Sequence, residues 1–114
     1  MNKYLKECYL YKTNQFDALR LKKFCPKAIE IGAELKLKCE KHDMTAQGKV
    51  VAKTLEGDGT IVGVLSDEDA KDIKPYLEME WNEVFLCRVS KNDFKADENK
   101  RLSIAISIRK KGEQ

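Results

Sequence analysis

The sequence predicts a mainly β domain with one or two helices (α+β), a small OB-like or SH3-like β-barrel of five to six strands. Residues 102–108 alternate in polarity, an Asp-Gly pair separates β-branched runs at 49–55 and 60–65, and a capped helix begins after Ser66. Several short strands with one inserted helix are typical of a closed or nearly closed barrel. We therefore expect one domain over residues 1–114.

The last two strands are predicted from their side-chain patterns. Residues 102–108 read LSIAISI, so that leucine and isoleucine fill one face while serine and alanine form a small, crowded second face. Residues 83–90 read EVFLCRVS, and their content of valine and phenylalanine favours a strand. We expect these two strands to pair across the polar loop that joins them.

Earlier strands are marked by turns. After a turn at Gly32, residues 35–38 alternate leucine and lysine, which predicts a strand. The runs at 49–55 and 60–65 flank Asp-Gly, a strong hairpin signal because its turn needs positive φ angles. Gly63, inside the second run, predicts a bulge or a close backbone approach.

One helix is predicted after Ser66, whose side chain can cap it. The acidic residues 67–69 suit the positive end of the helix dipole. Pro75 should shorten or split the helix near Lys74. Its apolar stripe consists of Ala70, Ile73 and Leu77. Residues 16–24 are a candidate second helix.

The composition is that of a folded chain with a charged surface. The chain has 114 residues, of which 42% are hydrophobic and 36% charged, and a formal net charge of +3. Basic residues gather at both ends while residues 56–83 are acidic, which fits either solvated faces or a functional basic patch. No apolar stretch approaches the ~18 residues of a membrane span. Lys6 and Glu7 interrupt the first apolar run, so we expect no export signal, a cytoplasmic protein and four free cysteines.

Candidates for catalysis and metal binding are few. His42 is the one histidine, and with Cys39 it forms a C-x-x-H pair, two of the four ligands that a structural zinc site needs. A buried Cys39 followed by a surface His42 explains the pair as well. Phosphate-binding glycine motifs are missing from the sequence. We therefore expect no catalytic residues, no metal and no cofactor, and a protein that is not an enzyme.

The sequence from Gly32 onward resembles the HIRAN domain family in its order of strands, turns and helix. The positions that carry the resemblance are Gly32, Leu35, Leu37, Glu40, Val50, Ala52, Gly59, Val62, Gly63, Leu65, Ala70 and Ile73. The resemblance implies a stand-alone, bacterial-type OB-like barrel with its core at residues 32–109 and an added strand or helix segment at 1–31. Some members of that family hold the 3′ end of single-stranded DNA with stacked aromatic rings and polar contacts.

The chain departs from the family pattern at contact positions. An aromatic residue, an acid and an asparagine are replaced by Thr45, Ala46 and Gly48, and Val64 stands where a polar residue is common. The resemblance thus implies the fold, without the residues of 3′-end recognition.

We expect a non-catalytic module that binds nucleic acid, single-stranded DNA or DNA ends. Tyr9 and Tyr11 are two residues apart, so they should share one face of a strand, with lysines nearby. Such a face suits single-stranded nucleic acid, because aromatic rings stack on bases while lysines contact phosphates. The expected contacts are Lys6, Tyr9, Tyr11, Lys12, Arg20, Lys22, Lys23, His42 and Lys49. The alternative is a protein-interaction module that uses a strand edge or the barrel rim. Trp81 is expected in the core, and the sequence leaves the oligomeric state open.

Overall fold

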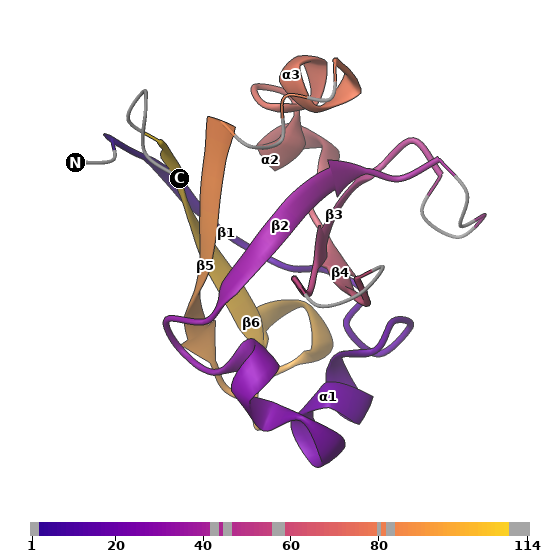
Figure 1. Cartoon of the computed structure of the whole chain (residues 1–114). Helices are drawn as coiled ribbons and strands as arrows, with labels where there is room; N and C mark the ends of the chain where they lie inside the picture. Colours follow the sequence, from indigo (N-terminus) through magenta and orange to yellow (C-terminus); the bar gives the residue numbers. More distant parts are fainter. Residues whose placement is uncertain are drawn as a thin grey trace.

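A computed structural model of the chain describes residues 3–41, 44, 47–55, 59–79, 81 and 84–109 (Figure 1). Its elements are β1 (Lys3–Tyr9), α1 (Ala18–Phe24), the 3₁₀-helix η1 (Pro26–Ile29), β2 (Glu34–Cys39), β3 (Val50–Lys53), β4 (Ile61–Val64), α2 (Asp67–Ala70), α3 (Lys74–Glu78), β5 (Phe85–Asn92), the 3₁₀-helix η3 (Glu98–Lys100) and β6 (Leu102–Ile108).

The six strands form one antiparallel sheet in the order β1-β6-β5-β2-β3-β4. The sheet curls, so that the chain beyond β1 reaches the far edge strand β4 (Figure 1). There Tyr11 N donates to Val64 O at 2.7 Å, and Val64 N donates to Tyr11 O at 3.0 Å. This bridge joins the two ends of the sheet, and the expected mainly β, barrel-like fold is confirmed.

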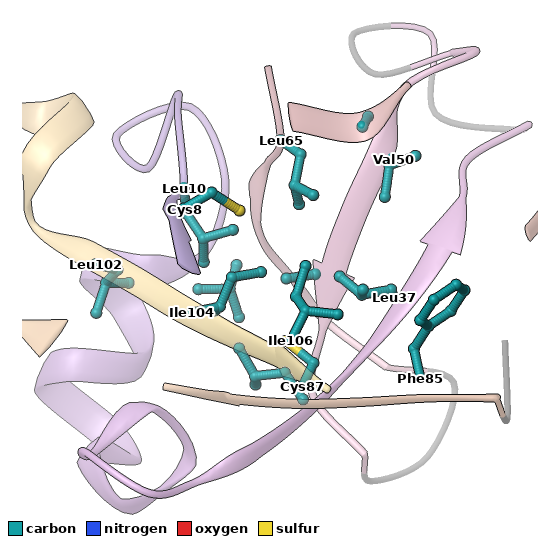
Figure 2. Packing of buried hydrophobic residues seen from close by; sticks show 14 of the residues in the cluster. Cys8, Leu10, Leu37, Val50, Leu65, Phe85, Cys87, Leu102, Ile104 and Ile106 are labelled. Atoms are coloured by element: carbon teal, nitrogen blue, oxygen red, sulfur yellow. The ribbon is translucent and has the colours of Figure 1, made fainter. Parts of the chain in front are cut away.

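The core fills the inside of the curl (Figure 2). Ile104 and Ile106 of β6 are fully buried and belong to one cluster with Leu37 of β2 and Leu10. The opposite side of β6 is crowded as expected, because Ser103 is also buried. The pairing of β5 with β6 is confirmed, with the β5 strand ending at Asn92 rather than residue 90.

The predicted hairpin is formed by β3 and β4. Gly59 has a φ of +81°, as the turn requires, while Asp58 lies outside the described residues. Gly63 sits where the chain closes the barrel: a Cβ there would lie 3.0 Å from both Leu10 Cβ and Tyr11 O. The expected close backbone approach at Gly63 is therefore confirmed.

The predicted helix and its split are confirmed. Ser66 Oγ accepts a hydrogen bond from Asp69 N at 3.1 Å, and Pro75 occupies the first turn of α3 after the break that follows α2. The candidate helix at residues 16–24 is α1, which begins two residues later than its predicted start.

Two sequence-based expectations are wrong. Tyr9 and Tyr11 do not share one strand face, because β1 ends at Tyr9 and the fully buried Leu10 leads the chain across to β4. Trp81 is not in the core: it is 51% exposed, since the end of α3 places it beside Tyr76 on the surface.

Cys8, Cys39 and Cys87 are buried and Cys25 is exposed, and all four are free, as expected. Within the described ranges, no helix has the length and apolar content needed to cross a membrane.

Candidate nucleic-acid interface

Lysines cover the outer face of β2 and β3. Leu35 and Leu37 point into the core, so the alternation of a strand turns Lys36 and Lys38 outward. Lys36 is the register partner of Lys53, and Lys38 is the register partner of Val51. Three lysines therefore lie on two adjacent strands.

Two aromatic rings lie on the same outer face. Val51 and Val64 are 0% and 3% exposed although they point away from the barrel core, because Tyr11 and Phe16 pack over them. The rings are themselves half-buried. The register pairs Lys38 with Val51 and Val51 with Val64, and Val64 bridges to Tyr11, so lysine and ring stand in one row.

Two more lysines border the rings near the start of α2. Lys49 Nζ donates to Asp67 Oδ1 at 2.9 Å. This hydrogen bond, followed by the charges of Lys49, Lys74 and Lys12, lowers the pKa of the exposed Asp67 carboxyl. Lys12 follows Tyr11 in the chain, and its charge also acts on the Asp67 carboxyl, so Lys12 lies near the Lys49–Asp67 pair. We call Tyr11, Phe16, Lys12, Lys36, Lys38, Lys49 and Lys53 together the lysine face.

The lysine face has an excess of positive charge. Its five lysines are accompanied by Asp67 and by Glu40, whose Oε1 lies 3.8 Å from Lys53 Nζ. The Lys53 and Glu40 side chains are 12% and 7% exposed, so this ion pair lies low on the surface. Cations around half-buried rings are the combination that single-stranded nucleic acid requires.

The structure brings together Tyr11, Lys12 and Lys49 of the residues expected from the sequence. Lys6 is engaged elsewhere: its Nζ donates to Asp69 O at 2.9 Å and to Asp72 Oδ2 at 3.0 Å, tying β1 to the α2 region.

Tyr9 lies on another side of the barrel. It pairs in register with Ser103 of β6, and Lys91 Nζ sits 5.2 Å from its ring centroid. It therefore belongs to the outer face of β1, β6 and β5.

The three expected cations of α1 lie on that exposed helix. Arg20 Nε is 3.4 Å from Asp17 Oδ1, and the ammonium groups of Lys22 and Lys23 sit over the rings of Phe94 and Phe24. His42 lies outside the described residues.

Sequence reasoning missed Phe16, Lys36, Lys38 and Lys53 as binding candidates. The signal for two of them was present, because the alternation that turns Leu35 and Leu37 inward turns the intervening lysines outward. Lys53 and Phe16 join the face only through strand pairing and tertiary packing.

In the described part of the chain, no three His, Cys, Asp or Glu side chains are grouped as metal ligands. Cys39 is a buried β2 residue, as the simpler explanation of the C-x-x-H pair expects. Val64 is 3% exposed and points its side chain under the aromatic rings.

Comparison with protein-family models, curated proteins and solved structures finds no match for this chain. The HIRAN resemblance therefore stays a prediction.

Proposed function

We propose that the chain is a non-catalytic module that binds single-stranded nucleic acid across the lysine face. The observation that supports this most is the row of Lys38 on β2, Val51 on β3 and Val64 on β4, which Tyr11 extends through its bridge to Val64. A base stacked on a ring at one end of the row would place its phosphate within reach of lysines on either side.

The expected energetics follow from the two kinds of side chain. Stacking on an aromatic ring contributes about 1–3 kcal/mol per base and tolerates any base. Lysines contribute by releasing counterions from phosphates, which makes affinity dependent on salt. Binding should therefore be weakly selective for sequence and sensitive to ionic strength.

The lysine face is expected to bind the nucleic-acid strand along its course, without recognising its 3′ end. Gly48 and the buried Val64 offer no side chain that could read a terminal nucleotide. Strands with free and blocked 3′ ends should accordingly bind with equal affinity.

Fluorescence anisotropy of a labelled single-stranded oligonucleotide at low salt tests the proposal. Lys36→Glu and Lys38→Glu together should weaken binding at least tenfold, because two cations become two repelling charges. Lys95→Glu is the matched control, since Lys95 is exposed in the β5–β6 loop. No binding by the wild-type chain, or equal losses in the paired variant and the control, would overturn the proposal.

The aromatic contribution needs variants that keep the cover over Val51 and Val64. Tyr11→Leu and Phe16→Leu retain apolar packing and remove the ring. Each should weaken binding by the loss of one stacked base, roughly fivefold to 150-fold. Circular dichroism melts of the two variants show whether the fold is kept.

A patch on the barrel rim favours the alternative, a protein-interaction module. Tyr76, Met79 and Trp81 are 46%, 59% and 51% exposed, and the two ring centroids are 6.3 Å apart. Exposed aromatic and methionine side chains are enriched in protein interfaces. Trp81 is the one tryptophan, so its fluorescence reports on this patch. If nucleic acid binds the lysine face, Trp81 emission stays constant through the titration.

A further inference from the structure

The outer face of β1, β6 and β5 adjoins the lysine face through β2, where Glu34 is the register partner of Arg88, and it has an ordered pattern. Side chains of residues paired across antiparallel strands point to the same side of the sheet. Cys8, Ile104 and Val89 point into the core, which leaves their neighbours outward. The register then gives three outward rows: Tyr4–Ser107–Leu86, Glu7–Ala105–Arg88 and Tyr9–Ser103–Lys91.

The side chains of β6, in the middle of this array, are smaller than those of β1 and β5 on its two sides. Ser107, Ala105 and Ser103 all belong to β6 and carry the smallest side chains of the array. The β1 side carries two tyrosines and one acid, and the β5 side carries one leucine and two cations. Two bulges, between Tyr4 and Lys6 and between Val89 and Lys91, keep all three rows on one side.

The charged side chains of the central row are available to a partner. Glu7 and Arg88 are both exposed. Arg88 Nη1 donates to Gly32 O at 3.0 Å, which holds its guanidinium at the margin of the face. The Ala105 between them separates the two charges by two strand spacings, about 10 Å.

The array is complementary to itself. We infer that it pairs two copies of this chain face to face, about a two-fold axis that runs along β6 in the interface. Such an axis exchanges the β1 and β5 sides and keeps each row level with itself. Glu7 of each copy then meets Arg88 of the other, Tyr9 meets Lys91, and Tyr4 meets Leu86. The small β6 column lets the two sheets approach closely.

Other arrangements lack this complementarity. A two-fold axis across the strands would set Glu7 against Glu7 and Arg88 against Arg88, which repel. A nucleic acid on this face would meet Glu7 in the central row. The array has nine side chains per copy, against the roughly 20–30 residues a side of a standard interface, so the dimer should dissociate at micromolar concentrations or above.

Sedimentation equilibrium of the full chain tests the inference. Chain concentrations from about 1 µM to about 1 mM cover the dissociation constants expected for a small interface. The wild type should pass from monomer to dimer. Glu7→Arg and Arg88→Glu should each weaken association at least tenfold, because like charges then face each other twice. Lys38→Glu, on the lysine face, should leave association unchanged.

Mixing the two single variants separates a lost interface from a damaged fold. A one-to-one mixture of Glu7→Arg and Arg88→Glu restores opposite charges at both contacts, and a heterodimer should form that neither variant forms alone. A monomeric wild type at 1 mM, or a dimer insensitive to both changes, would overturn the inference. The inference would also be overturned if the chain is monomeric and Arg88→Glu weakens its binding to DNA, because this face would then bind nucleic acid.

Discussion

Adding one methyl group at Gly63 is expected to open the barrel where its two ends meet. The new Cβ would lie 3.0 Å from Leu10 Cβ and 3.0 Å from Tyr11 O, and both neighbours belong to the closing segment. Overpacking of this kind costs about 1–3 kcal/mol. If the segment moves away, two backbone hydrogen bonds of about 0.5–1.5 kcal/mol each are lost as well. Gly63→Ala should therefore lower the free energy of unfolding by roughly 2–6 kcal/mol.

Urea denaturation and amide hydrogen exchange measure the two parts of this effect. At about 4 °C per kcal/mol for a domain of this size, the thermal midpoint should fall by roughly 10–25 °C. Exchange at the amides of Tyr11 and Val64 should accelerate beyond the global change, because these groups form the bridge. Gly48→Ala is the control, since its Cβ would meet nothing within 4 Å and its φ of +79° adds only backbone strain, about 1–2 kcal/mol. The claim that the barrel closes against Gly63 is wrong if Gly63→Ala has the wild-type unfolding midpoint and the amides of Tyr11 and Val64 exchange at wild-type rates.

Three further predictions concern local contacts. Ser66→Ala removes the cap of α2 and should cost about 1 kcal/mol in urea denaturation; an unchanged midpoint would show that the cap does not matter. Lys49 lowers the pKa of Asp67, so their ion pair stabilises the fold fully at pH values above the ordinary pKa of aspartate. This contribution is lost as the pH falls through the lowered pKa. Lys49→Met should raise the pKa of Asp67 in an NMR titration, and a constant value would contradict the pairing. The exposed Cys25 should react with a thiol reagent within seconds, whereas burial, aided by Asp69, raises the pKa of Cys8 to about 12, so Cys8 should react only as fast as the chain unfolds.

Local signals predicted most of the strands and turns. The alternation at residues 102–108, the cap at Ser66 and the break at Pro75 each depend on neighbouring residues. Such features can be predicted from a single sequence, and the structure has them at or near the expected positions.

Contacts between distant segments were beyond sequence reasoning. The spacing of Tyr9 and Tyr11 predicts one strand face, but Tyr11 bonds to Val64, 53 residues away. Trp81 follows Leu77 and Met79 at alternating spacing, which predicts a buried side chain. The short helix α3 ends at Glu78, however, and Trp81 lies on the surface. In both cases tertiary packing overrides the local pattern.

The candidate site was predicted only in part for the same reason. Tyr11, Lys12 and Lys49 share a neighbourhood because the barrel closes on β4 and because Asp67 follows that strand. Lys53 joins them through its pairing with Lys36. Neither relation is visible before the strand order is established.

The salt dependence of oligonucleotide affinity tests the lysine face most directly. Each phosphate held by a lysine contributes about −0.7 to the slope of log K against log salt concentration for a single strand. Three to five contacts predict a slope of about −2 to −3.5 for the wild type. Changing Lys36 and Lys38 to methionine should make the slope shallower by about 1.4, with Lys95→Met unchanged. A wild-type slope near zero, or one that these two substitutions leave unaltered, would contradict the account.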